Sequence, residues 1–120
     1  MKKFFQGFAF AFAGFKILVT TERNFKIHLF AFVVVATAGF YFKIDNVEWL
    51  AILIISSLIL TAEALNTALE KLCNHLHPEY HLAIKNVKDI SAAAVLISSI
   101  IAVIIAGIIF SQPIYDLLIN

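Results

Sequence analysis

Two carboxylates and an amide recur at helical spacing near the middle of the chain. At roughly 100° per residue, Glu63, Asn66 and Glu70 fall within about 60° of one another, and Thr67 shares their face. An apolar run, Trp49 to Ala62, comes directly before them. Carboxylates on an apolar helix are costly in hydrocarbon and normally face a bundle interior or a polar cavity. One ion pair with a neighbouring lysine would explain one carboxylate, so three polar groups together favour a functional site.

A second set of charged residues lies where the last apolar segment begins. Lys85, Lys88 and Asp89 have i, i+3, i+4 spacing and share a face if their helix begins early. Positive charge at a helix N-terminus attracts anions, and Lys88 with Asp89 suits a phosphate and its metal. Taken alone, these residues fit ordinary flanking charge and an Asp N-cap. The Glu63–Glu70 stripe opposite makes the functional interpretation the stronger one.

Other candidate ligands carry weaker signals. Glu22 is the only acid in the first polar segment and can add a carboxylate for Mg²⁺, although its spacing alone fits a surface residue. The Cys73–His77 segment with His81 matches none of the paired Cys/His spacings of zinc sites, so we interpret these residues as interfacial. His28 is interpreted as a head-group contact. The sequence has no glycine-rich phosphate loop of the Walker type.

The composition indicates a membrane protein. Of 120 residues, 62% are hydrophobic and 14% are charged, against a usual charged share of about 25%. A single domain of this size cannot bury so much apolar surface in water. The net charge of +1 provides no basic patch for nucleic acid.

The N-terminal segment predicts a helix that lies in the membrane interface, at about residues 3–19. Phe4, Phe8, Phe12 and Phe15 share one helical face, with lysines at both ends. A cleaved signal peptide is the alternative, but Gln6 interrupts the apolar core and no polar mature domain follows.

The remaining chain predicts three membrane-spanning helices, at about 26–44, 47–72 and 89–111, within one domain covering 1–120. Thr20 or Thr21 is expected to cap the first span, and residues 43–46 form a turn. Residues 74–87 are expected to be a polar connection. Pro113 is expected to follow the end of the last helix.

Lysine and arginine counts predict the orientation. Five basic residues precede the first span and three lie between the second and third spans, whereas the first turn carries one and the C-terminus none. The positive-inside rule therefore places the N-terminus and the 71–88 connection in the cytoplasm. The polar stripe then runs from cytosolic water at Glu70 to head-group depth at Glu63. A site there can meet a soluble ligand at one end and a lipid head group at the other.

These motifs resemble those of the bacterial diacylglycerol kinase and undecaprenol kinase family, which are small integral-membrane lipid kinases. The resemblance covers nearly the whole chain and rests on four segments: Glu63-Ala64-Leu65-Asn66-Thr67-Ala68-Leu69-Glu70, Glu79-Tyr80-His81, Lys88-Asp89-Ile90-Ser91-Ala92-Ala93-Ala94-Val95-Leu96, and Glu22 at the family's spacing before Glu63. Glu22-Arg23-Asn24-Phe25 with Ile27-His28 is nearer the undecaprenol kinase branch.

The resemblance implies an all-α homotrimer in the bacterial cytoplasmic membrane, with three spans and a surface helix per subunit and sites between subunits. It implies MgATP as phosphoryl donor and Glu63 as the base that takes the proton of the lipid hydroxyl. Glu63, Asn66 and Ala92 then contact the lipid, and Glu22 and Glu70 hold Mg²⁺. The implied nucleotide contacts are Glu22, Glu70, Glu79, Tyr80, His81, Lys88 and Asp89, with Lys3 and Phe10 where the family can present an arginine and a tyrosine.

The expected reaction is phosphorylation of undecaprenol to undecaprenyl phosphate. Diacylglycerol phosphorylation to phosphatidic acid is the alternative within the family. A small proton-coupled multidrug exporter, which also relies on an intramembrane glutamate, is a more distant alternative, and a purely structural membrane subunit is the least favoured.

Overall fold

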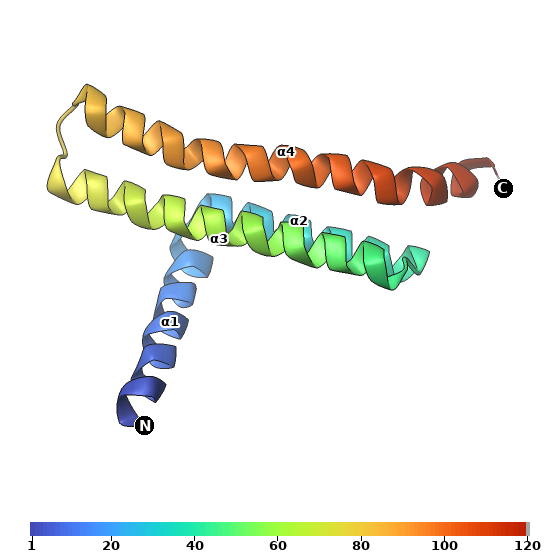
Figure 1. Cartoon of the computed structure of the whole chain (residues 1–120), viewed down its shortest axis with the longest axis horizontal. Coiled ribbons are helices and arrows are strands. Elements are labelled where there is room, and N and C mark those ends of the chain that lie inside the picture. Colours follow the sequence, from blue (N-terminus) through green and yellow to red (C-terminus); the bar gives the residue numbers. More distant parts are fainter. Residues whose placement is uncertain (120) are drawn as a thin grey trace.

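The computed structural model describes residues 1–119, which form four helices joined by short connections (Figure 1). These are α1 (Lys2–Thr21), α2 (Arg23–Phe42), α3 (Asn46–Leu76) and α4 (Leu82–Ile119). All four are long and apolar enough to cross a membrane. The predicted all-α class is confirmed.

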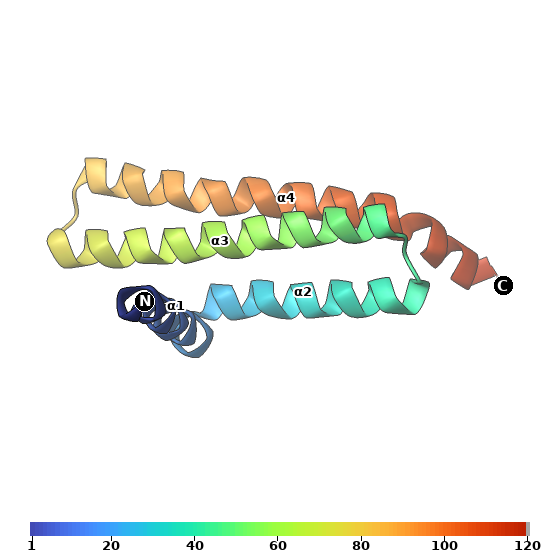
Figure 2. The same cartoon turned by 60° about the horizontal axis from the view of Figure 1, so that its bottom comes forward.

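Helices α2, α3 and α4 lie side by side along the long axis of the molecule, and α1 points away across their common direction (Figures 1 and 2). α3 is the middle helix and contacts both α2 and α4. α1 touches mainly α2 and has no buried residue. The arrangement leaves α1 free to lie in a different plane from the three packed helices.

Local sequence explains where α2 ends and α3 begins. Lys43 ends α2 in the left-handed region, at φ 54° and ψ 48°. Asp45 then accepts hydrogen bonds from the backbone N–H groups of Val47 and Glu48, and the Glu48 side chain accepts one from the Asp45 N–H. This reciprocal capping box satisfies donors that the first turn would otherwise leave unpaired. The predicted turn at 43–46 is confirmed.

Three local predictions are wrong, and they concern the N-cap of α2, the connection between α3 and α4, and Pro113. Glu22, not a threonine, is the N-cap of α2, because Thr20 and Thr21 turn their hydroxyls back onto carbonyls of α1. The polar connection shrinks to residues 77–81, since α3 continues to Leu76 and α4 already begins at Leu82.

Pro113 lies inside α4 and does not follow its end. Its ring fixes a φ that a helix accepts, but it removes one backbone hydrogen bond and crowds the carbonyl one turn earlier, which bends the helix. Gln112 donates to Asp116 at 2.9 Å across the proline, which supports the continued helix. The last turns bend away from the rest of α4 (Figure 2).

Little of the apolar surface is buried within the chain. The main cluster of buried apolar residues consists of Ile52, Ile109 and Phe110, at 2%, 6% and 8% exposure. Large side chains elsewhere are open, such as Phe30 at 69% and Val103 at 73%. Because so much apolar surface cannot face water, lipid or other apolar surface must cover it. The chain is an integral membrane protein.

Candidate active site

The polar stripe of α3 runs from the interior of the helix packing to its open end. Glu63 and Thr67 are buried at 3% and 7% exposure, Asn66 is half-buried and Glu70 is exposed. The stripe therefore connects a shielded carboxylate with an accessible one, as the spacing predicted. A buried carboxylate among apolar helices needs a polar surrounding or a ligand.

A cavity of about 280 Å³ opens beside Glu63, and we call it the Glu63 cavity. All three residues expected to contact the lipid line it, namely Glu63, Asn66 and Ala92. Its complete lining comes from α2, α3 and α4: Asn24, His28, Glu63, Asn66, Ala92, Val95, Leu96 and Ser99.

Two polar residues of this lining were not singled out from the sequence. Asn24 lies one turn before His28 in α2, a spacing that could have placed both on the cavity face. Ser99 lies in a long apolar helix beside Ser98, and no sequence signal distinguishes the two serines. His28 itself, interpreted as a head-group contact, faces the cavity.

A hydrogen bond fixes α3 against α4 at the cavity. Ser91 Oγ lies 2.6 Å from Asn66 Oδ1 and 2.9 Å from the Lys88 carbonyl oxygen, and its single proton can be donated to either. The contact with Asn66 joins two sequence motifs that are 25 residues apart. It holds the Asn66 amide at the wall of the cavity.

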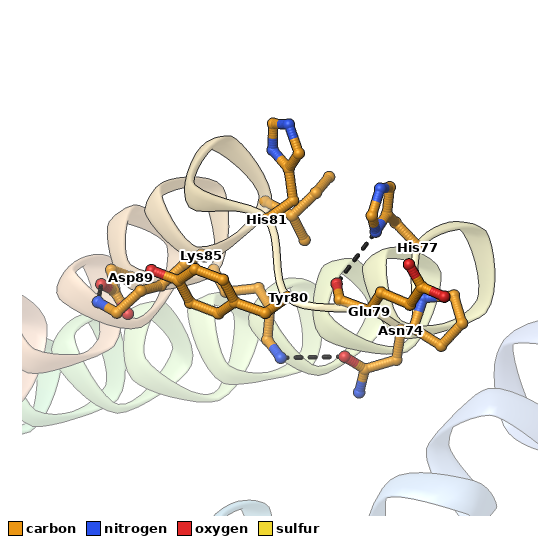
Figure 3. A pocket seen from close by; sticks show the side chains of 10 residues that line it. Asn74, His77, Glu79, Tyr80, His81, Lys85 and Asp89 are labelled. Carbon is orange, nitrogen blue, oxygen red and sulfur yellow. Dashed lines mark hydrogen bonds and ion pairs between the residues drawn. The ribbon is translucent and has the colours of Figure 1, made fainter.

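A second pocket of about 260 Å³ surrounds the connection between α3 and α4 (Figure 3). We call it the connection pocket. All five residues expected to contact ATP near this connection line it, together with Asn74, His77, Pro78, Ile84 and Lys85; the five are Glu79, Tyr80, His81, Lys88 and Asp89. Since α4 begins at Leu82, Lys85, Lys88 and Asp89 are helical residues, as their common-face interpretation required.

Polar contacts order the connection pocket. Lys85 pairs with Asp89 on the first turns of α4, and Lys88 Nζ donates to Asn74 Oδ1 at 2.9 Å. His77 Nδ1 lies 3.0 Å from the Glu79 carbonyl oxygen, and the rings of His77 and His81 point to the same side of the connection (Figure 3). Asn74 and His77 were not predicted to take part.

Lys88 links the two pockets. Its ammonium lies 3.9 Å from the Glu70 carboxylate, and Ser91, which bonds to Asn66, follows one turn later. Positive charge thus lies between the connection pocket and the acidic stripe. Such charge favours an anion placed there.

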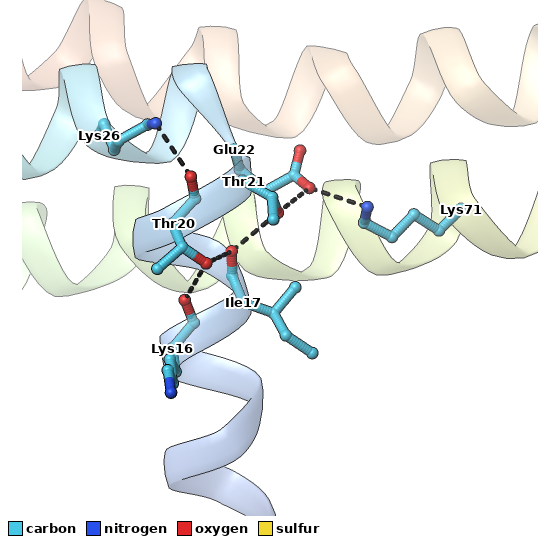
Figure 4. A network of polar contacts seen from close by, with 7 residues as sticks. All are labelled: Lys16, Ile17, Thr20, Thr21, Glu22, Lys26 and Lys71. Carbon is cyan, nitrogen blue, oxygen red and sulfur yellow. Dashed lines mark hydrogen bonds and ion pairs between the residues drawn. The ribbon is translucent and has the colours of Figure 1, made fainter.

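Glu22 lies at the junction of α1 and α2 and turns toward α3 (Figure 4). Its carboxylate is 2.8 Å from Lys71 Nζ. Thr21 Oγ1 lies 2.8 Å from this carboxylate and 2.8 Å from the Ile17 carbonyl oxygen, and its single proton can be donated to either. The Lys71 ammonium, followed by the Thr21 hydroxyl, lowers the pKa of the Glu22 carboxyl below its ordinary value. Glu22 is therefore ionised at neutral pH and close to the end of α3 that carries Glu70.

Lys3 and Phe10 are not brought to either pocket within one chain. Both lie on α1, which points away from the packed helices. Lys3 lines a shallow apolar hollow on α1 itself, and Phe10 is 75% exposed.

The carboxylates suit a magnesium ion only in combination with other ligands. Among residues 1–119, no three His, Cys, Asp or Glu side chains gather into a metal cluster. Mg²⁺ does not need such a cage, because one or two carboxylates with phosphates and waters usually bind it. Glu22 and Glu70 are a donor set of that kind.

A bundle of long apolar helices with a buried carboxylate beside a polar pocket defines an integral membrane protein with a candidate site at one end of its helices. The sequence profile of prokaryotic diacylglycerol kinases matches residues 9–110. The chain belongs to the prokaryotic diacylglycerol kinase family, and it is therefore a lipid kinase. This membership decides against the exporter and structural-subunit interpretations.

Two relatives have different names. The chain is similar to a diacylglycerol kinase of Synechocystis sp., with 35% identity over 113 residues, which are 93% of this chain and 65% of that protein. The chain thus spans slightly less than two thirds of that relative. It is also similar to an undecaprenol kinase of Bacillus subtilis, with 33% identity over 110 residues, which are 92% of this chain and 89% of that protein.

Proposed function

We propose that the protein transfers the γ-phosphoryl group of ATP to the hydroxyl of a membrane lipid alcohol, with undecaprenol as the preferred acceptor. The observation that carries this proposal is the position of Glu63. It is a buried carboxylate in a cavity lined by Asn66 and Ala92, next to the polar connection pocket at one end of the same helix pair. Phosphoryl transfer needs positioning, charge neutralisation and a base, and these residues can supply all three.

Glu63 is the proposed general base. Its carboxylate takes the proton of the lipid hydroxyl as the hydroxyl oxygen bonds to the γ-phosphorus of ATP, and ADP leaves. Asn66, held by Ser91, helps to orient the acceptor. Ala92 leaves space for the lipid beside them.

The connection pocket is the proposed nucleotide site. Lys88 lies between this pocket and Glu70, where it can neutralise phosphate charge at the approach to the Glu63 cavity. Asp89, Glu79, Tyr80 and His81 line the same pocket and would contact the rest of the nucleotide.

Glu22 and Glu70 would hold the magnesium ion that accompanies ATP. Each carboxylate has a lysine beside it, Lys71 for Glu22 and Lys88 for Glu70, and Mg²⁺ would take the place of the ammonium group at each carboxylate. The ion would neutralise charge on the transferring phosphoryl group.

We propose that α2, α3 and α4 span the bacterial cytoplasmic membrane and that α1 lies in its interface. The direction of α1 across the other helices and its exposed phenylalanines support this placement. Basic residues at the N-terminus and around the connection pocket support a cytoplasmic site. A homotrimer with sites between subunits accounts for Lys3 and Phe10, which would then meet the nucleotide from another subunit.

Undecaprenol is favoured by the segment Glu22–His28, which resembles the undecaprenol kinase branch, and by the phenylalanine-rich α1. The exposed side chains of α1 offer hydrocarbon and few hydrogen-bond donors. A polyprenol has no polar group other than its hydroxyl, so apolar contacts are enough to bind the rest of it. Diacylglycerol is the second candidate, because the Synechocystis relative is named for it.

The deciding experiment offers both lipids to the purified protein in the same mixed micelles with MgATP. We expect phosphorylation of both, with the larger kcat/KM for undecaprenol, and loss of both activities in Glu63→Gln. A larger kcat/KM for diacylglycerol would overturn the choice of acceptor and leave the kinase in place. No phosphorylation of either lipid would overturn the proposed function.

A further inference from the structure

Ser99 lines the Glu63 cavity, and its hydroxyl oxygen is buried and has no hydrogen-bond partner. Serines in helices normally bond to a carbonyl of the preceding turn, and Ser98 does so with Ala94 at 2.9 Å. A buried polar group left unpaired is destabilising, and more so where no water can reach it. The unpaired oxygen therefore indicates a place where a ligand completes the cavity.

The register of α3 against α4 places Ser99 beyond Glu63, seen from the connection pocket. Asn66 is paired with Ser91. Moving away from the connection, Glu63 comes three residues from Asn66 along α3, and Ser99 comes eight residues from Ser91 along α4. At 1.5 Å per residue, Ser99 lies at most about 7.5 Å deeper than Glu63. The packing of Ile52 with Ile109 further along the pair gives a smaller offset.

A second, mainly apolar cavity lies in the same direction. His28 lines both the Glu63 cavity and a neighbouring cavity of about 80 Å³. The walls of this second cavity include Phe32, Val35, Ile59 and Ala102. Ile59 lies one turn beyond Glu63, and Ala102 lies nearly one turn beyond Ser99. A lipid held with its hydroxyl at Glu63 would therefore pass Ser99 before its hydrocarbon enters the apolar part.

We propose that Ser99 is a specificity-determining residue whose hydroxyl donates a hydrogen bond to an ester carbonyl of a glycerolipid acceptor. This inference rests on the proposed function, with the free hydroxyl of the acceptor at Glu63. In diacylglycerol the ester carbonyls lie a few bonds from the hydroxyl, on its hydrocarbon side. A polyprenol carries no oxygen there, so Ser99 gives it no advantage. The contact lets one cavity accept a second lipid class without changing the chemistry at Glu63.

The test compares diacylglycerol with a dialkylglycerol, which keeps the free hydroxyl and chains but lacks both carbonyls. In wild type we expect kcat/KM to be about tenfold higher for the diacyl lipid, the size of one well-made hydrogen bond. In Ser99→Ala the ratio should fall to about one. Ser99→Cys fills the space with a weak donor and should also lose most of the ratio.

Ser98→Ala is the matched control, because it removes a hydroxyl that already bonds to its own helix. It should leave the diacyl-to-dialkyl ratio unchanged. An equal ratio in wild type and Ser99→Ala would overturn the inference while the kinase assignment stands, and so would a wild type that phosphorylates undecaprenol alone. A wild type that phosphorylates no lipid alcohol would overturn the proposed function itself.

Discussion

Lys71 Nζ lies 2.8 Å from Glu22 Oε1, and this ion pair fastens the junction of α1 and α2 to α3 (Figure 4). Lys71 directly follows Glu70 in the chain. The contact therefore brings the two carboxylates proposed for Mg²⁺ to the same end of α3. It also gives the otherwise loosely packed α1 a polar anchor.

The first prediction concerns the base. Glu63→Gln keeps the size and most hydrogen bonding of the side chain but removes the proton acceptor. We expect a normally folded protein whose kcat falls by about 10²–10⁴-fold. The measurement is lipid phosphorylation by the purified variant. Glu48→Gln makes the same chemical change at the other end of α3, where glutamine can still complete the capping box, and should remain active. Near-normal turnover by Glu63→Gln would exclude this role.

The second prediction concerns magnesium. Glu22→Ala and Glu70→Ala should each raise the Mg²⁺ concentration needed for half-maximal activity at fixed ATP, because each removes a hard oxygen ligand. Lys71→Ala separates this role from the ion pair, since it breaks the contact but keeps the carboxylate. It should leave the Mg²⁺ requirement unchanged or lower it. A defect in Lys71→Ala equal to that of Glu22→Ala would show that the ion pair, not the metal, explains Glu22.

The third prediction follows from the lowered pKa of Glu22. Because the folded pKa lies below the unfolded one, the Glu22–Lys71 pair stabilises the fold above the unfolded pKa, about 4.3. That contribution is lost as the pH falls through the lowered folded pKa. Lys71→Met should therefore reduce the Tm at pH 7. The free energy of unfolding should fall by the modest contribution of an exposed ion pair, about 0.2–1 kcal/mol. The difference in Tm from wild type should shrink as the pH falls through the lowered folded pKa and vanish below it. A difference that persists or grows in acid would contradict the assignment.

The fourth prediction concerns the contact of α2 with the start of α3. A Cβ added at Gly39 would lie 3.0 Å from the Ile44 side chain and 3.0 Å from the Trp49 ring. Gly39→Ala should thus displace the ring and cost about 1 kcal/mol or more of stability through overpacking. Trp49 is the only tryptophan, so its fluorescence reports the change directly. Gly107→Ala is the control, because no atom lies within 4 Å of its added Cβ. An unshifted emission with unchanged Tm would refute the close packing.

The sequence by itself determined the class and the main polar stripe. Apolar composition and helical spacing are local properties, so they indicated membrane helices and placed Glu63, Asn66 and Glu70 on one face. The turn at 43–46 was predictable for the same reason, since its capping residues act within one turn. Residue roles carried over from the family resemblance stay predictions.

Tertiary structure decided which residues of other helices meet that stripe. α4 is apolar on all sides, so its periodicity does not reveal which face packs against α3. Only the packed pair shows that Ser91 bonds to Asn66 and that Ser99, not Ser98, lines the Glu63 cavity. The continuation of α4 through Pro113 was equally unreadable, because a proline stops a helix or merely bends it according to the packing and hydrogen bonds around it.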